Sequence, residues 1–352
     1  MKRFPSELED IVVDFCHEDH ATLAACGLVC RSWLPTSRYH LFSSITLTAK
    51  NVRDFLDIVS LSPVVPSLVQ DVELRFSGIS LLDLEVVPIL VRLTRTARLT
   101  LRPARDEVTL AVCTSSLSRA LPSLGLLHLK FDFKSRFESL QQVIACACLC
   151  PNLESLEVGG SWMKRGDFPV PPQLPKTLHT LILTCDLDYF LTWFMGLEDR
   201  MPVIQHLYLH HIAGREVATV ARYLQAAAAD LKTLSLAFRD NDAAENLAPR
   251  LDLAESTDLR DLQFEGHAAG VVSCLSAVIP QLDLCTTEIT ITLRCRNGQD
   301  LVHAHPWVEL DDKLRPAKRV TLAVIDPLTQ KPRNDIALGI LTQLTCAEGM
   351  LS

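Results

Sequence analysis

The sequence lacks a long apolar run. Its longest stretch without a charged residue covers 266–282 and is interrupted by Pro280, whereas a membrane-spanning helix needs about 20 predominantly apolar residues. We therefore expect no transmembrane segment and no membrane partner. The first ten residues include Glu7, Glu9 and Asp10 where the apolar core of a secretory signal would lie, so we expect a cytoplasmic or nuclear protein.

An excess of positive charge is also missing. Lys and Arg total 34 against 42 for Asp and Glu, which gives a formal net charge of −8. Proteins that bind nucleic acids concentrate Lys and Arg on a basic domain. We therefore expect no nucleic-acid partner.

The strings that mark common catalytic centres do not occur in the sequence. It contains no Walker loop, no Gly-x-Gly-x-x-Gly and no Gly-x-Ser-x-Gly. We therefore expect a protein that is not an enzyme and that needs no cofactor.

The twelve cysteines do not form an obvious disulfide framework or metal site. Without a secretory signal most should be reduced and buried as small apolar residues. The densest group, at 146–150, lacks the second pair of ligands that zinc requires, so packing is the better interpretation. We expect solvated side chains rather than metal ligands at two histidine pairs: His17 with His20, and His303 with His305.

A short repeated string accounts for the high apolar content of 48%. Apolar residues occupy its first, fourth and sixth positions, and copies recur about every 27 residues from residue 66 to residue 326. The clearest copies begin at Leu153, Leu178, Ile204, Leu231 and Leu259. Weaker copies centre on Val72, Leu99, Leu127, Ile289 and Val320.

The repeat predicts an α/β fold. The end of each string alternates apolar and polar residues, which is typical of a half-buried strand, and helical spacing follows between the strings. Such units bury their apolar faces only by stacking. The pattern resembles the leucine-rich repeats of the strand-helix type, which implies a curved solenoid of about ten repeats. The Cys or Asn that usually follows the strand is mostly absent, with Cys185 the nearest match.

Three segments depart from this regularity. Residues 159–176 contain four prolines and predict a long loop on the rim of the solenoid. Residues 288–305 predict a strand, an Asn-Gly turn and a return strand. Apolar residues between Ile336 and Leu344 predict a last helix, so 327–352 should form a capping helix and tail.

The first fifty residues do not follow the repeat. Their apolar positions predict three short helices, with Pro35 interrupting the third stretch. A helical segment of about 45 residues rarely folds stably without a partner. This segment therefore points to a binding module.

The same residues resemble the F-box. The family's opening Leu-Pro-x-Glu-Leu-x-x-x-Ile is matched by residues 4–11, with Phe4 replacing the first Leu. Its Leu-Val-Cys-Arg-x-Trp block is matched by residues 28–33, and its closing Arg-x-x-Leu-Phe by residues 38–42. The resemblance implies an F-box over 1–48, followed by a connecting helix over 49–65 and the repeats.

The resemblance also implies partners. F-box proteins with such repeats are substrate receptors of cullin-RING ubiquitin ligases of the SCF type, and the wording is similar to the large F-box families of mushroom-forming fungi. The F-box would bind a Skp-family adaptor and, through it, cullin. The resemblance implies an adaptor-binding role for Pro5, Leu8, Ile11, Leu28, Val29 and Trp33. For Val29 and Trp33, burial inside the F-box is an equal alternative.

The repeats offer a second surface. Side chains that flank the central apolar residue of each strand should point to the concave face, which solenoids commonly use for partners. We expect a substrate protein to contact this face or its rim at Arg75, Arg102, His128, Lys130, Trp162, His206, Tyr208 and His210. The first three repeats are mostly basic on this face, and the eighth is acidic. Any one of these residues could also be an ordinary solvated strand residue.

Three functions are compatible with the sequence. The first is a non-catalytic subunit that holds a protein substrate for ubiquitin-dependent degradation. The alternative is an interaction scaffold that binds the Skp-family adaptor without causing degradation. The third is a repeat-fold enzyme or small-ligand receptor, for which the sequence offers only the Cys and His groups discussed above.

Overall fold

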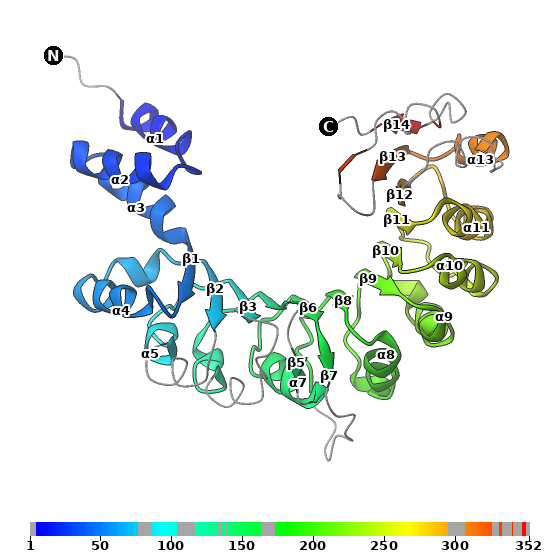
Figure 1. The fold of residues 1–352 in the computed structure, drawn as a ribbon, viewed down its shortest axis with the longest axis horizontal. Helices are drawn as coiled ribbons and strands as arrows, with labels where there is room; N and C mark the ends of the chain where they lie inside the picture. Colours follow the sequence, from blue (N-terminus) through cyan, green and yellow to red (C-terminus); the bar gives the residue numbers. More distant parts are fainter. Residues whose placement is uncertain are drawn as a thin grey trace. The chain divides into compact units, whose positions relative to one another are not determined.

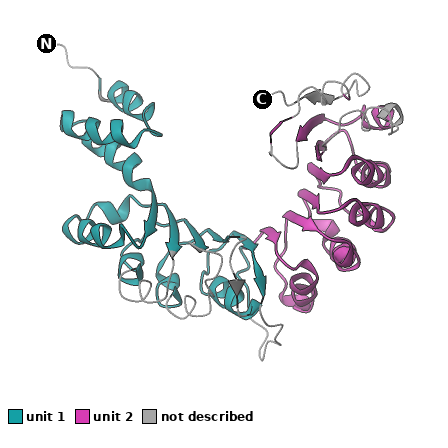
Figure 2. Cartoon of the chain, viewed as in Figure 1, with its two compact units in different colours: residues 1–177 teal, residues 178–352 magenta. Residues whose placement is uncertain are grey.

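The chain is an α/β protein in which N-terminal helices precede alternating strands and helices (Figure 1). In a computed structural model, the described residues are 5–76, 86–103, 117–132, 136–137, 139–162, 173–294, 307–325, 331–332, 340 and 347–349. The chain divides into two compact units, residues 1–177 and 178–352 (Figure 2). Their division falls inside the region predicted to form the repeats.

Unit 1 begins with the three predicted helices: α1 (Ser6–Asp14), α2 (His20–Val29) and α3 (Leu34–Ser43). Asp19 explains the start of α2, because its carboxylate accepts hydrogen bonds from two backbone N–H groups of the first turn. The predicted interruption at Pro35 is wrong. Pro35 lies in the first turn of α3, where a missing N–H removes no helical hydrogen bond.

The strands of unit 1 form a parallel sheet. In spatial order they are β1 (Ser44–Thr48), β2 (Asp71–Phe76), β3 (Arg98–Pro103), β4 (His128–Phe131) and β6 (Ser155–Gly159). The segments between them include α4 (Val52–Leu61), η1 (Val65–Ser67), α5 (Val87–Leu90), η3 (Leu121–Ser123) and α7 (Leu140–Cys148). A separate two-stranded sheet joins β5 (Arg136–Phe137) to β7 (Ser161–Trp162).

The register of unit 1 corrects the sequence prediction at one centre. The aligned apolar residues are Ile45, Val72, Leu99, Leu129 and Leu156. The third centre is therefore Leu129 and not Leu127, because Leu127 lies in the turn before β4 and donates its N–H to the Ala97 carbonyl at 2.8 Å. The row also begins at Ile45, ahead of residue 66. β1 thus joins the sheet from within the segment predicted as the F-box, and α4 lies within residues 49–65.

Unit 2 continues the strand-helix alternation. Its parallel strands, in spatial order, are β8 (Thr180–Thr184), β9 (His206–Ile212), β10 (Thr233–Phe238), β11 (Asp261–Gly266), β12 (Glu288–Arg294), β13 (Arg319–Ile325) and β14 (Ala347–Gly349). Its α-helices are α8 (Leu187–Met195), α9 (Val217–Ala227), α10 (Asn241–Leu247), α11 (Ala268–Val278) and α13 (Trp307–Leu314). Short 3-10 turns complete it: η4 (Glu198–Arg200), η5 (Gly214–Glu216), η6 (Ala228–Asp230), η7 (Ala248–Arg250) and η8 (Ile279–Gln281).

Two apolar rows form the core of the unit 2 sheet. The first contains the predicted centres Leu181, Leu207, Leu234, Leu262, Ile289 and Val320, all in register. The second contains Leu183, Leu209, Leu236, Phe264, Ile291 and Leu322, and both rows are buried. Each buried side chain of this size stabilises the fold by about 1.5–3 kcal/mol relative to an exposed one. The predicted centres of unit 2 are confirmed.

Side chains also join one repeat of unit 2 to the next. The buried carboxylate of Glu216 accepts hydrogen bonds from the backbone N–H groups of Leu187 (3.1 Å) and Ala213 (2.9 Å). Asn241 accepts one from the N–H of Gly270, at 2.9 Å, in the following helix. These bonds satisfy N–H groups at helix starts that no helical carbonyl reaches, so they fix the stacking of adjacent helices.

Several predicted features fall partly outside the described residues. β12 ends at Arg294, and the predicted Asn-Gly turn and return strand lie beyond the described part. So do residues 163–172 of the proline-containing loop. Of the predicted last helix only Ile340 is described, and it is helical and buried. Among the described helices, none has the length and apolar character needed to cross a membrane.

Candidate binding surfaces

The N-terminal helices have a small core. Across residues 5–43, the buried apolar side chains are Val13, Leu23 and Cys26. Three such side chains supply little burial energy compared with the rows of the sheet. The helices therefore have more apolar surface than they can bury among themselves.

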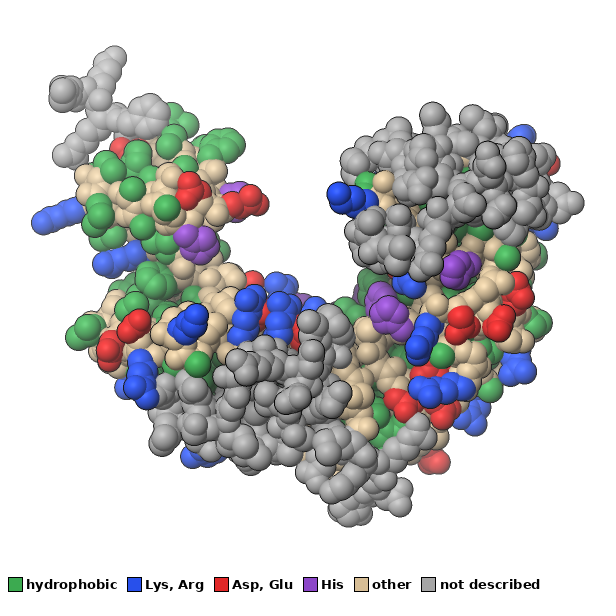
Figure 3. Space-filling model, viewed as in Figure 1, with side chains coloured by type: hydrophobic (Ala, Val, Ile, Leu, Met, Phe, Trp, Pro, Cys, Tyr) green, Lys and Arg blue, Asp and Glu red, His purple; other side chains and the backbone are tan. Residues whose placement is uncertain are grey.

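The apolar surface that the helices do not bury is exposed to solvent. Six apolar side chains are exposed on α1, on the residue directly after it and on α2, and we call this surface the N-terminal apolar face: Leu8, Ile11, Val12, Phe15, Leu28 and Val29. Phe15 is 85% exposed and Leu28 is 89% exposed. Figure 3 shows hydrophobic side chains over these helices. Clustered exposed apolar side chains mark interaction sites.

Most of the predicted adaptor-binding residues lie on this surface. Pro5 is exposed beside it, whereas Trp33 is half-buried at the start of α3. The sequence prediction omitted Val12 and Phe15. Their spacing from Leu8, at four and seven residues along one helix face, was the signal that could have identified them.

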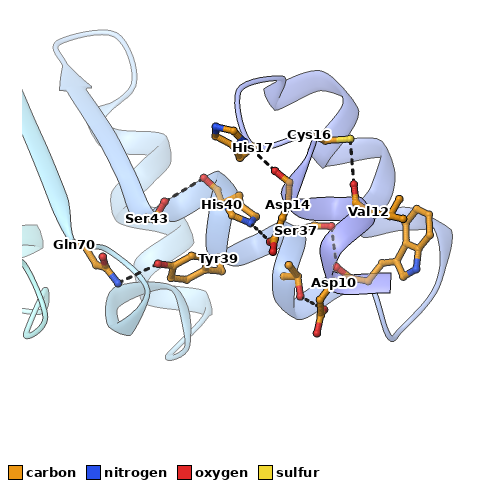
Figure 4. Close-up of polar contacts among 12 residues, drawn as sticks. Asp10, Val12, Asp14, Cys16, His17, Ser37, Tyr39, His40, Ser43 and Gln70 are labelled. Atoms are coloured by element: carbon orange, nitrogen blue, oxygen red, sulfur yellow. Dashed lines mark hydrogen bonds and ion pairs between the residues drawn. The ribbon is translucent and has the colours of Figure 1, made fainter. Parts of the chain in front are cut away.

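Polar contacts fix α1 against α3 (Figure 4). The Thr36 hydroxyl donates a hydrogen bond to the Asp10 carboxylate. The Nε2 of His40 lies 2.7 Å from the Asp14 carboxylate. Neither contact uses a side chain of the N-terminal apolar face. This face therefore stays exposed although α1 and α3 are packed against each other.

A second set of contacts joins the helices to the sheet of unit 1. The Gln70 side chain donates to the Tyr39 hydroxyl at 3.5 Å, and its backbone N–H donates to the Ser43 carbonyl at 2.8 Å. Because α3 leads directly into β1, the N-terminal helices are anchored to the first two strands.

In each strand, the side chains that alternate with the buried apolar ones point to the other surface of the sheet. We call this surface the strand face. In unit 1 Arg102 lies between two acids: its Nη1 is 3.1 Å from Glu73 and its Nε is 2.8 Å from the buried Asp132. Arg75 contacts the same Glu73 at 2.8 Å, and this contact raises the pKa of its guanidinium.

Two further ion pairs complete this arrangement. Lys130 lies 2.7 Å from Glu157, and Arg98 lies 3.3 Å from Asp71. Exposed pairs of this kind stabilise a fold by only about 0–1 kcal/mol each. Their main effect is on charge, because every one of these cations has an acidic partner. The predicted basic residues are therefore present on this surface, and acidic partners offset their charge.

His128 and Trp162 are the remaining substrate-binding residues predicted in unit 1. His128 is half-buried and starts β4, next to Lys130 in the same strand. Trp162 lies on β7, where it pairs in register with Phe137 of the two-stranded sheet, and it is half-buried. The structure therefore places Trp162 outside the main sheet of unit 1.

The strand face of unit 2 brings three predicted residues together on β9: His206, Tyr208 and His210. All three side chains are half-buried. Burial raises the pKa of the Tyr208 hydroxyl, and the charge of Asp261 adds to this effect. Ile182, which the sequence prediction omitted, is the register partner of Tyr208 on β8. The alternation rule that identified Tyr208 also identifies Ile182.

A hydrogen-bonded chain fixes the protonation of His206. The Thr233 hydroxyl donates to the Asp261 carboxylate at 3.3 Å, so it accepts from Nδ1 of His206, 3.0 Å away. Burial lowers the pKa of the His206 ring, helped by the nearby His179 and Lys232. The ring is therefore neutral at neutral pH, with its proton on Nδ1 and an acceptor at Nε2.

The cysteine cluster behaves as packing. Cys146 and Cys150 are buried on or beside α7, and Cys148 is half-buried. Burial raises the pKa of the Cys148 thiol to about 11 and that of Cys150 to about 12. These thiols are therefore protonated at neutral pH. The described residues contain no group of three or more His, Cys, Asp or Glu side chains arranged to hold a metal ion.

Comparison with known proteins adds no family. No protein-family model matches the sequence, and a search of curated proteins finds no significant match.

Proposed function

We propose that this protein is the substrate-recognition subunit of an SCF-type cullin-RING ubiquitin ligase. Its N-terminal helices act as an F-box that binds a Skp-family adaptor through the N-terminal apolar face. Its strand-helix units act as a leucine-rich-repeat-like solenoid that binds a protein substrate through the strand face. The chain itself carries out no catalysis.

The N-terminal apolar face is the observation that carries this proposal. The stretch from Leu28 to Trp33 matches an F-box motif, and the same stretch begins with two exposed apolar side chains. Phe15, Ile11 and Leu8 extend this surface along α1. A partner that covered these side chains would supply the burial that the helices lack.

The arrangement of the chain supports a tethering role. The N-terminal helices offer an apolar surface, and the repeats offer a polar one on a different part of the chain. A protein that binds an adaptor by one surface and a substrate by the other raises the effective concentration of the substrate near the transferase.

Co-expression with a Skp-family adaptor tests the proposal. The Pro5→Ala, Leu8→Ala double variant should bind the adaptor at least about 30-fold more weakly, because truncating a central interface residue commonly costs about 2 kcal/mol or more. Leu61→Ala is the matched control, since Leu61 is 85% exposed on α4, outside the residues predicted to form the F-box. Undiminished capture by the double variant would refute the proposal.

A second measurement separates the ligase from the scaffold. Capture of both adaptor and cullin, with an interacting protein that accumulates when residues 1–43 are deleted, supports the ligase. Capture of the adaptor alone, with no protein accumulating, supports the non-degradative scaffold.

A further inference from the structure

The strand β9 contains a strained bulge. Leu236 and Phe238 of β10 pair with Leu209 and Ile212 of β9, so β9 has one extra residue. His211 lies in this bulge, and its φ of 61° is in the left-handed region. This conformation costs a non-glycine residue about 1–2 kcal/mol, and such strain is concentrated at functional positions.

The bulge changes what β9 presents. Ile212 returns to the core and is fully buried, while His210 is half-buried and His211 is exposed. Two successive histidines therefore follow His206 and Tyr208 along one strand. We call the surface formed by Ile182, His206, Tyr208, His210 and His211 the β9 patch.

The centre of the β9 patch is apolar and aromatic. Ile182 and Tyr208 are register partners on adjacent parallel strands, which lie about 4.8 Å apart. The following positions of the same row are Ser235, Gln263, Thr290 and Thr321. The two bulky side chains therefore form a local contact site within an otherwise small or polar row.

Two histidines of the β9 patch, His206 and His211, have lowered pKa values. His206 is neutral, as described above, and its ring contacts that of His179 edge to face at 5.8 Å. His211 is exposed, but partial desolvation by the atoms around its ring lowers its pKa, as do the charges of Arg294 and Arg239, while Glu265 opposes them.

Two of the nearby cations, Arg294 and Lys232, already have partners. Arg294 contacts Glu265 at 2.6 Å and donates a hydrogen bond to the Phe238 carbonyl at 3.2 Å. Lys232 donates to the Gln205 side chain at 3.1 Å.

We propose that the β9 patch binds an uncharged segment of the substrate protein by one aromatic or branched aliphatic side chain. This inference rests on the proposed function and names the class of substrate segment. The side chain packs against Tyr208 and Ile182, and an N–H group of the segment donates to Nε2 of His206.

An acidic or phosphorylated segment fits the strand face less well. Recognition of such a segment depends on Arg or Lys side chains that can form charge-assisted hydrogen bonds with it. Arg75, Arg102 and Lys130 of unit 1 each contact a carboxylate, and Arg294 of unit 2 does the same. Binding an acidic segment would require breaking these pairs.

Selection from a phage-displayed library of random peptides tests the inference. The full chain, immobilised by a terminal tag, should enrich peptides with little net charge that share a Trp, Phe, Leu or Ile. Synthetic copies of these peptides should bind Tyr208→Ser at least tenfold more weakly than the unaltered chain. Val203→Ser is the matched control, because Val203 is an exposed apolar residue of unit 2 that lies outside its strands, and it should leave binding unchanged.

A second variant keeps the test valid if Tyr208→Ser does not fold. His211→Gly relieves the left-handed strain, so it should raise the melting temperature while weakening peptide binding. Enrichment of acidic peptides, binding of phosphoserine peptides in preference to their serine forms, or no peptide that depends on Tyr208 or His211 would each overturn the inference.

The same samples distinguish the inference from the proposed function. Capture of the Skp-family adaptor depends on the N-terminal apolar face and should be unaffected by Tyr208→Ser. Adaptor capture without neutral peptides refutes the β9 patch alone. Neutral peptides without adaptor capture refute the proposed function and leave the β9 patch as a peptide-binding site.

Discussion

The N-terminal helices and the repeats use the same apolar residue types in opposite ways. Leu28 of α2 is 89% exposed, whereas Leu207 of β9 is completely buried. Each repeat buries its apolar side chains between its own strand and helix and those of its neighbours. The N-terminal helices pack on one another and against the first strands of unit 1, and they keep six large apolar side chains exposed. Stability and partner binding should therefore be separable by mutation.

The largest expected effect on stability comes from the repeat core. Leu207→Ala should lower the free energy of unfolding by about 2–5 kcal/mol, because it removes a fully buried side chain from the centre of a row. Urea unfolding of the full chain measures the change. A loss below about 1 kcal/mol would contradict the account of the core.

A smaller loss is expected where two helices meet. A Cβ added at Gly270 would lie 2.4 Å from the Cβ of Ala244 on the preceding helix. Gly270→Ala should therefore cost about 1–3 kcal/mol, although helix propensity alone would stabilise it by about 1 kcal/mol. Adding Ala244→Gly should recover part of the loss. A Gly270→Ala variant more stable than the unaltered chain would show that the helices do not pack closely here.

A pH-dependent effect is expected from Glu216, which joins two repeats. Burial raises the pKa of its carboxyl above the unfolded value, despite two backbone N–H groups that oppose the shift. Its protonated form therefore stabilises the fold below the unfolded pKa, and this contribution is lost as pH rises through the folded pKa.

Melting temperatures of the unaltered chain and of Glu216→Gln, measured from pH 4 to pH 7, test this prediction. The unaltered chain should lose stability relative to the variant as pH rises. A difference that is constant, or that changes in the opposite direction, would show that Glu216 does not titrate this way.

The smallest effect on stability is expected on the N-terminal apolar face. Leu28→Ala should change the free energy of unfolding by no more than about 0.5 kcal/mol, as for other exposed positions. Paired with Leu207→Ala in the same unfolding assay, it gives the sharpest contrast between the two regions. A loss above about 2 kcal/mol would mean that Leu28 belongs to a core.

The sequence predicted the strand-helix alternation well because the repeat signal is local. Strand register was harder to predict where several leucines lie close together in the sequence. Leu126, Leu127 and Leu129 allow two registers, and only pairing with Leu99 selects Leu129. The alternating Ile45 and Leu47 of β1 were visible, but they directly follow the F-box-like motif and were assigned to it.

The surfaces could be predicted only in part. Helical spacing predicts an apolar stripe on α1, but it does not show whether the stripe faces a core or solvent. The resemblance to the F-box motif predicted that the stripe faces a partner. Pairing of Arg102 with Asp132 depends on which strands are neighbours. The bulge at His211 left no signal in the sequence, because no glycine or asparagine marks its left-handed conformation.

Hydrogen-deuterium exchange of the full chain, with and without a purified Skp-family adaptor, tests the central claim most directly. The account predicts that the adaptor slows exchange in α1, α2 and the start of α3, and leaves the strands of unit 2 unchanged. Unchanged exchange across residues 6–34, at an adaptor concentration that saturates a known F-box protein, would contradict it.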